Sequence, residues 1–217
     1  EIGPDGFGPS DPTPVSFRDM GGGGVVSENP VWQIVNIWEA SPAFERLLYH
    51  PFIVKAVSQL TGHDDLMVWH DQIQYKPANY GGSTRWHQDA PLWPIIKPMT
   101  PVSAWVPIDD ADEENGCMYV IPGSYVSGEV EHSRSKTGNG NISKILLSTQ
   151  IDESNAVRIP LSAGHAMVHH CLTLHATRPN FSSRDRRAMV INYMPIGTRN
   201  GEGELLKEGY PILTSTS

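Results

Sequence analysis

TRWHQDAPLWP, residues 84–94, is the stretch on which the fold and the candidate site both depend. It places His87 and Asp89 two residues apart in a segment that has the features of a strand. Successive side chains of a strand point to opposite faces, so the imidazole and the carboxylate are expected on the same face. Such a pair can occupy two neighbouring positions around one metal ion.

A third ligand is available in the segment LTLHATRPNFSSRDRRAMVINY, residues 172–193, which contains His175. Two imidazoles and one carboxylate form the facial triad that leaves open positions on non-heme Fe(II). His165, His169 and His170 compete for this role, and period two puts His169 on the same face as His175 only if no bulge intervenes. The spacing to the downstream arginine favours His175.

The downstream arginine is Arg186, eleven residues after His175. Open positions on iron suit O₂ and 2-oxoglutarate, and a guanidinium can bind the far carboxylate of 2-oxoglutarate through two parallel hydrogen bonds. Arg187 is expected on the opposite face of the strand, and Arg184 is expected in the preceding turn. Arg186 is therefore the preferred anchor for the cosubstrate.

A second H-x-D sequence, His63-Asp64-Asp65, follows Thr61-Gly62 at an expected helix end. We interpret it as a solvated loop rather than as the metal pair, because it lies outside a strand.

Composition indicates one domain of 217 residues with a substantial core. The net charge of −8 argues against nucleic acid or an anionic membrane as partner. No apolar run approaches the roughly 20 residues of a membrane-spanning helix. Cys117 and Cys171 do not make a disulfide framework, so a reducing cytoplasm is the expected location. The oligomeric state is not readable from these data.

Two helices are expected near the start, after a Gly- and Pro-rich covering segment at residues 1–30. Ser41-Pro42 is a helix start, with Ser as the N-cap and Pro at the first position. Pro51 opens a second helix that Gly62 ends. The expected apolar face of this second helix consists of Phe52, Ile53, Ala56, Val57 and Leu60.

From residue 66 onward the sequence is typical of short strands separated by turns. The expected strands are Leu66–Lys76, Trp86–Asp89, Val102–Ile108, Cys117–Ile121, Ala156–Leu161, His165–His170 with the segment up to His175, and Arg187–Met194. Two helices followed by such strands predict a mainly β protein, a jelly roll or double-stranded β-helix with flanking helices. Residues 127–155 are largely polar and are predicted to be mostly loop. A loop of this length is a candidate lid or substrate loop.

Three segments carry a resemblance to a known family. They are YKPANYGGSTRWHQDAPLWP, SAWVPIDDADEENGCMYVIPGSY and LHATRPNFSSRDRRAMVINY. The chain resembles the phytanoyl-CoA dioxygenase-like branch of the Fe(II)/2-oxoglutarate oxygenases over most of residues 38–195, with 127–155 unmatched. It departs from the family at His165, where many members have Asp, and it lacks several dozen N-terminal residues that such proteins usually carry.

The resemblance implies roles for individual residues. His87, Asp89 and His175 correspond to the iron ligands, and Arg186 corresponds to the cosubstrate arginine. Three further positions correspond to residues that line the cosubstrate in the family, namely Trp105, Thr177 and Gln72. A carboxylate at position 89 favours hydroxylation, since related halogenases have a small residue there.

The function expected from these residues is an Fe(II)- and 2-oxoglutarate-dependent oxygenase that hydroxylates a C–H bond of a small molecule and releases succinate and CO₂. Desaturation, epoxidation or demethylation would use the same triad, and the substrate is not readable. One alternative is a jelly-roll protein that binds a metal or ligand without turnover. Another is a cupin-type non-oxidative metalloenzyme, which would usually carry more histidine ligands and no cosubstrate arginine.

Overall fold

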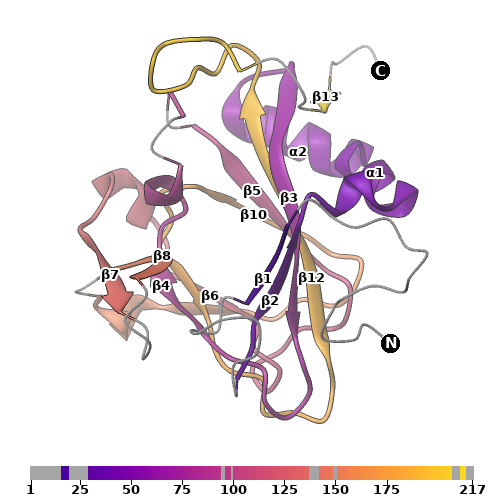
Figure 1. Ribbon diagram of the computed structural model, residues 1–217, viewed down its shortest axis with the longest axis vertical. Helices are drawn as coiled ribbons and strands as arrows, with labels where there is room; N and C mark the ends of the chain where they lie inside the picture. Colours follow the sequence, from indigo (N-terminus) through magenta and orange to yellow (C-terminus); the bar gives the residue numbers. More distant parts are fainter. Residues whose placement is uncertain are drawn as a thin grey trace.

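The structure is a computed structural model of the chain, and it describes residues 16–19, 29–93, 96–98, 100–136, 142–148, 151–206 and 211–213. Two β-sheets face each other across the molecule, and two helices cover the outer side of the larger one (Figure 1). The expected jelly roll with flanking helices is confirmed.

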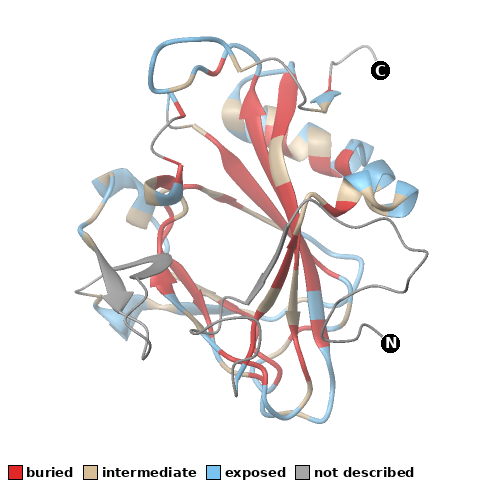
Figure 2. Cartoon of the chain, viewed as in Figure 1, coloured by how far each residue is buried: buried red, intermediate tan, exposed pale blue. Residues whose placement is uncertain are grey.

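The larger sheet has seven strands in the order β1-β2-β3-β12-β5-β10, with β13 paired to β3. Their bounds are β1 Ser16–Asp19, β2 Trp32–Val35, β3 Leu66–Lys76, β5 Val102–Pro107, β10 Met167–His170, β12 Arg186–Pro195 and β13 Ile212–Leu213. All of these pairs are antiparallel. The long strand β12 lies between β3 and β5, and it is buried on both faces over most of its length (Figure 2).

The smaller sheet has four strands in the order β4-β11-β6-β9. Their bounds are β4 Thr84–His87, β6 Met118–Val120, β9 Val157–Ile159 and β11 His175–Thr177. The expected strand through His165–His175 is therefore two strands, β10 and β11, which belong to different sheets. The turn between them carries the chain from one sheet to the other.

The two helices have the expected starts. Helix α1 spans Pro42–Leu48 and α2 spans Pro51–Thr61, each with proline in its first turn, and Gly62 ends α2 with a φ of 72°. The predicted apolar face of α2 is partly wrong. Ile53 and Val57 are buried, but Phe52 and Leu60 are largely exposed, because the sheet contacts only the stripe formed by positions four residues apart.

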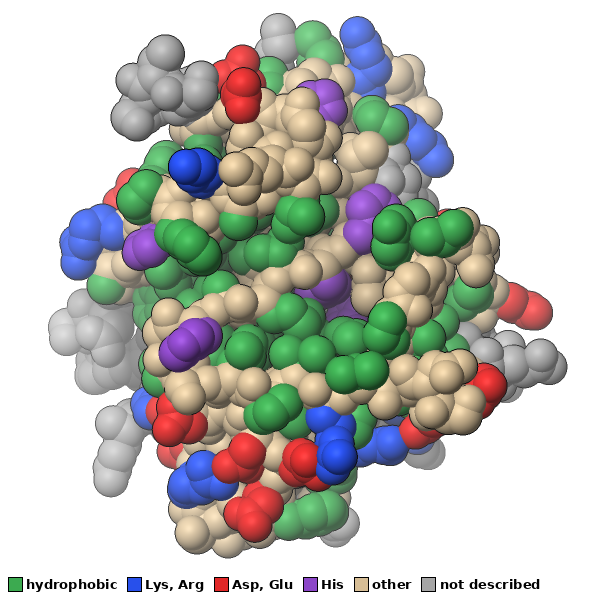
Figure 3. Space-filling model, turned by 180° about the vertical axis from the view of Figure 1, so that it is seen from behind, with side chains coloured by type: hydrophobic (Ala, Val, Ile, Leu, Met, Phe, Trp, Pro, Cys, Tyr) green, Lys and Arg blue, Asp and Glu red, His purple; other side chains and the backbone are tan. Residues whose placement is uncertain are grey.

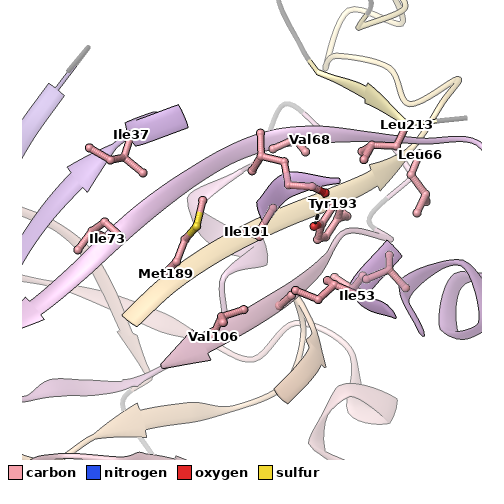
Figure 4. Packing of buried hydrophobic residues seen from close by; sticks show 14 of the residues in the cluster. Ile37, Ile53, Leu66, Val68, Ile73, Val106, Met189, Ile191, Tyr193 and Leu213 are labelled. Carbon is pink, nitrogen blue, oxygen red and sulfur yellow. Dashed lines mark hydrogen bonds between the residues drawn. The ribbon is translucent and has the colours of Figure 1, made fainter. Parts of the chain in front are cut away.

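Side chains from both helices and the larger sheet form the main hydrophobic core. Met189, Ile191 and Tyr193 alternate along β12 and point to the helix side, where they pack against Ile53 of α2 and Val106 of β5 (Figure 4). The intervening residues of β12 face the other sheet, as period two requires. This face forms the floor of the candidate site.

Within the described residues, four short 3₁₀ helices join the strands, η1 Ile37–Glu39, η2 Ala90–Leu92, η3 Ser124–Ser127 and η4 Glu153–Asn155. Within residues 127–155, expected to be mostly loop, the structure has a hairpin of β7 His132–Lys136 and β8 Ile142–Ser148. Residues 1–30 also contain a strand, β1, while residues 1–15 and 20–28 of that predicted covering segment lie outside the described residues.

Candidate metal centre

Three side chains converge between the two sheets. His175 on β11 pairs with His87 at the end of β4, and their ring centroids lie 4.1 Å apart. Asp89 Oδ1 lies 3.5 Å from His87 Nε2 and 3.6 Å from His175 Nε2. One donor atom from each residue lies within 4.8 Å of the other two. The three atoms are thus close enough to bind a single ion.

Asp89 reaches this position in a different way from the one expected. Strand β4 ends at His87, and Asp89 has helical dihedral angles, φ −73° and ψ −34°, just before η2. The backbone N–H groups of Asp89 and Ala90 both donate to the Cys171 carbonyl, at 2.9 and 3.0 Å. The predicted strand through Asp89 is therefore wrong, and a turn tied to the β10–β11 connection directs the carboxylate.

Backbone carbonyls orient both imidazoles. His87 Nδ1 lies 2.8 Å from the Arg85 carbonyl, and His175 Nδ1 lies 2.9 Å from the Thr173 carbonyl. An Nδ1–H donated to a carbonyl leaves the lone pair on Nε2, which is the nitrogen that faces Asp89. Burial, followed by the neighbouring His87, lowers the pKa of His175 to about 3, so this imidazole is neutral at physiological pH.

Asp89 combines burial with several polar partners. Burial alone would raise its pKa, but His175, His169 and His87 around it hold the pKa of this carboxyl well below its usual range. Asp89 is therefore a carboxylate at neutral pH. Neutral imidazoles together with a carboxylate are ligands that suit a divalent iron ion.

A small cavity opens beside these side chains. Its lining consists of Gln72, Gln74, Thr84, His87, Asp89, Trp105, Met118, His169, His175, Ala176, Thr177 and Val190. Figure 3 shows histidine side chains recessed near the middle of one face of the molecule, with hydrophobic side chains around them. Gln72, Trp105 and Thr177, which the family resemblance singles out, thus lie together with the three candidate ligands.

Arg186 lies just beyond the cavity lining. It is fully buried at the start of β12, its guanidinium carbon is 5.7 Å from the centre of the Trp105 ring, and Nη1 donates to the Gln74 carbonyl at 3.3 Å. Among the described residues, Nε and Nη2 have no hydrogen-bond partner, and neither has Nε1 of Trp105. Burial lowers the pKa of Arg186 to about 10, which leaves it positively charged at neutral pH.

Lys76 is a second buried basic side chain at this end of the site. It pairs with Arg186 across β3 and β12, and its Nζ donates to the Arg178 carbonyl at 2.5 Å. Burial, followed by the charge of Arg186, lowers the pKa of Lys76 well below its usual range. The charge of Arg186 makes this end of the barrel interior attractive to an anion.

The rival candidates for the cosubstrate arginine and for the metal pair lie at exposed positions. Arg187 is exposed and binds Asp109 through Nε and Nη2, at 2.8 and 2.7 Å. Arg184 is exposed in the preceding turn and donates to Asp112 at 2.7 Å. His63, in the second H-x-D sequence, is exposed in a loop after α2.

The other three histidines occupy different environments. His169 lines the cavity. His170 is half-buried beside Tyr125, with the ring centroids 5.7 Å apart. His165 is exposed and lies before β10, which begins only at Met167, so the predicted start of this strand at His165 is wrong.

Two residues beside the site were not singled out from the sequence. Ser103 lies 3.0 Å from Asp89 Oδ2, and Asn192 lies 2.7 Å from Ser103. A signal was present: Ser103 is two residues before Trp105, and Asn192 is six residues after Arg186. Even spacings along strands put them on the same faces as residues already assigned to the site.

Comparison with known proteins identifies the family. The family model for phytanoyl-CoA dioxygenase (PhyH) matches residues 23–188, which is most of the chain. The chain belongs to the PhyH family. The resemblance inferred from the three sequence segments is thereby confirmed.

Individual PhyH relatives and structural neighbours agree with this assignment. The bovine phytanoyl-CoA dioxygenase domain-containing protein 1 is 29% identical over 82% of this chain and 62% of its own. The non-heme monooxygenase ThoJ has a TM-score of 0.67 at 29% identity, over 77% of this chain and 60% of its own. EvdO2 from Micromonospora carbonacea, solved with 2-oxoglutarate, has a TM-score of 0.64 at 25% identity, over 76% of this chain and 72% of its own.

The chain spans about half to 62% of the length of the curated relatives that it matches. In the described part of this PhyH chain, no helix is long and apolar enough to cross a membrane.

Proposed function

We propose that this chain is an Fe(II)- and 2-oxoglutarate-dependent oxygenase that hydroxylates a C–H bond of a small molecule. The observation that carries the proposal is the combination of two adjoining features. His87, Asp89 and His175 present three donor atoms to one point, and unpaired donors of Arg186 and Trp105 lie buried at the adjoining end. The first feature suits a metal ion, and the second suits an anion.

The three ligands would bind iron in the facial arrangement that leaves positions open for small molecules. The carbonyls of Arg85 and Thr173 hold the imidazole rings, so both Nε2 atoms present their lone pairs without rearrangement. Iron and 2-oxoglutarate, when bound with O₂, supply the oxidising power and yield succinate and CO₂. The protein supplies orientation and exclusion of water.

The cosubstrate end would be organised by Arg186. Its planar guanidinium has two donors available for the distal carboxylate, and the ring of Trp105 lies under it. Thr177 Oγ1 accepts from the Thr84 N–H at 3.2 Å, so its own hydrogen remains to be donated to the same carboxylate. Gln72, whose side chain accepts from Gln33 Nε2, lines the same cavity.

The substrate would enter beside the hairpin β7–β8, since β8 lies next to β4 and η2, which flank His87 and Asp89. We retain the prediction that residues 127–155 act as a lid or substrate loop of a single domain, residues 1–217. A small-molecule substrate and a cytoplasmic location likewise remain predictions.

The decisive experiment measures turnover without a substrate. Purified protein with Fe(II) and 2-oxoglutarate is expected to form succinate slowly, and His87→Ala or Asp89→Ala is expected to abolish this. His63→Ala and Asp65→Ala, in the exposed H-x-D sequence, are the matched controls and should retain it. If the wild-type protein with Fe(II) neither binds nor decarboxylates 2-oxoglutarate, the oxygenase proposal is wrong.

The same experiment separates the alternatives. A metal-binding protein without turnover would bind Fe(II) and form no succinate. The cupin-type alternative would need a further histidine ligand, and His169, whose Nε2 lies 3.5 Å from Asp89 Oδ2, is the candidate. His169 falls outside the group of donor atoms that lie within 4.8 Å of one another.

A further inference from the structure

The two oxygens of Asp89 face different surroundings. Oδ1 points to the two Nε2 atoms of His87 and His175. Oδ2 points to the larger sheet, where Ser103 Oγ lies at 3.0 Å and His169 Nε2 at 3.5 Å. A carboxylate can bind a metal through one oxygen or through both, and the choice changes the number of positions left for other ligands.

Behind Oδ2, polar residues form one row across four strands. Register pairs His70 on β3 with Asn192 on β12, Asn192 with Ser103 on β5, and Ser103 with His169 on β10. Asn192 and Ser103 are fully buried. A row of polar side chains in the middle of a sheet is costly unless each member is hydrogen-bonded, so this row requires an explanation.

Hydrogen bonds connect this row to Asp89. Ser103 Oγ lies 2.7 Å from the Asn192 side-chain amide, and that amide lies 3.1 Å from His70 Nε2. A hydroxyl has one hydrogen, and an ionised carboxylate only accepts, so Ser103 donates to Asp89. The Asn192 amide is placed with Oδ1 toward Ser103 and with Nδ2 toward His70, 3.4 Å from the His70 carbonyl. Once Ser103 donates to Asp89, the amide matches its partners when it is turned over, so that its NH₂ group faces Ser103 and its oxygen faces His70 Nε2. All three donors in this series point in the direction of Asp89.

We propose that Ser103, oriented by Asn192 and His70, holds Asp89 Oδ2 away from the metal, so that Asp89 binds through Oδ1 alone. Ser103 and Asn192 are positioning residues, since they act through Asp89 and touch neither metal nor substrate. The inference rests on the proposed metal site and adds the device that keeps a coordination position open there.

His169 supports this arrangement from the other side. Its side chain is buried, its ring lies 4.6 Å from that of His175, and neither ring nitrogen has a hydrogen bond of normal length among the described residues. At 3.5 Å, Nε2 is too far from Oδ2 for a strong hydrogen bond, but it lies against the oxygen that faces the larger sheet.

The test is titration of the full chain with Co(II) alone, followed by visible absorption. Ser103→Ala removes the hydroxyl that holds Oδ2, so Asp89 is free to bind through both oxygens. Co(II) affinity is expected to change by roughly tenfold or more, with weaker absorption bands as the coordination number rises. Asn192→Leu removes the residue that orients Ser103 and should shift the bands in the same direction. Ser103→Thr keeps the hydroxyl and should restore wild-type values.

The matched control is Tyr193→Phe. Tyr193 neighbours Asn192 on β12 but faces the other core, where its hydroxyl donates to the Leu48 carbonyl at 2.8 Å. Loss of the Tyr193 hydroxyl should lower thermal stability. The Co(II) affinity and the intensity of the absorption bands should stay within twofold of the wild-type values. Unchanged affinity and bands in Ser103→Ala, or an equal change in Tyr193→Phe, would overturn the inference while the metal site stands. No Co(II) binding by the wild-type chain would overturn both proposals.

Discussion

His87 and His175, 88 residues apart in the chain, are direct partners on neighbouring antiparallel strands. Directly paired side chains on one face of such strands lie close together, and these two rings are 4.1 Å apart. The pairing of β4 with β11 therefore creates the candidate metal centre, and Asp89 completes it from the turn that follows β4.

Arg186→Lys tests whether the guanidinium is needed for its shape. Lysine keeps a charge but has no fork for a carboxylate. We expect the dissociation constant for 2-oxoglutarate to rise roughly tenfold or more, equivalent to about 1.4 kcal/mol, as measured by calorimetry with Fe(II) present. Arg187→Lys, on the exposed face of the same strand, is the control. Equal effects in the two variants would contradict the assignment of Arg186.

Gln88→Leu tests how residues 127–155 are attached to the site. The buried Gln88 side chain donates to the carbonyls of Gly128 and Leu172, at 2.9 and 2.7 Å, and accepts from the Val130 N–H at 2.9 Å. Losing these bonds should release the start of the segment. Hydrogen exchange at the Val130 amide is expected to become at least tenfold faster. Exposed Gln59→Leu should leave that rate unchanged, and an unaltered rate in Gln88→Leu would rule out this attachment.

Asp71→Asn should alter how stability depends on pH. Burial raises the pKa of Asp71 from 3.8 to about 7, and among the described residues neither of its carboxyl oxygens has a hydrogen-bond partner. Between these values the unfolded chain loses the proton and the folded chain keeps it, so Asp71 makes stability fall as pH rises from about 4 to 7. Above pH 7 the loss is complete, at roughly 4 kcal/mol.

Urea unfolding between pH 4 and 8 measures this contribution. Asp71→Asn should flatten the decline of the unfolding free energy with rising pH and should increase the unfolding free energy at pH 8. Exposed Asp65→Asn serves as the control and should follow the wild-type profile. A steep decline that persists in Asp71→Asn would assign the pH dependence to another group.

Two glycine variants compare backbone strain with crowding. Gly116 and Gly123 both have positive φ, 86° and 75°, so alanine is strained at either position. A Cβ at Gly116 would also collide with the Arg178 carbonyl oxygen beside Lys76, whereas a Cβ at Gly123 would meet no atom within 4 Å. Gly116→Ala should therefore lose about 1–3 kcal/mol more unfolding free energy in urea than Gly123→Ala. Equal losses would mean that the turn adjusts freely.

Much of the architecture was predictable because local patterns agreed with the final packing. Pro42, Pro51 and Gly62 mark the helix ends, and strand β3 has the predicted bounds, Leu66–Lys76. These signals work because proline and glycine restrict or permit backbone angles irrespective of distant contacts. The hairpin β7–β8 was missed because β7, HSRSK, is polar and β8, ISKILLS, has no clear alternation of apolar and polar residues.

The predictions from sequence were wrong where contacts between residues far apart in the chain determine the local structure. Phe52 and Leu60 belong to the apolar pattern of α2 but lie outside its contact with the sheet. Asp89 was expected in a strand, yet the Cys171 carbonyl turns the backbone there. Neither outcome can be inferred from the neighbouring residues, because the first depends on how α2 packs on the larger sheet and the second on the turn after β10.

The sequence by itself determined the kinds of ligand, the H-x-D spacing, the distal histidine and the arginine that follows it, since these are choices of side-chain chemistry. Only the tertiary structure decided that His87 and His175 are strand partners, that Asp89 turns toward both, and that Ser103 and Asn192 stand behind it. The reason is physical. Strand pairing and register bring together residues tens of positions apart, and pairing is set by the packing of the whole barrel.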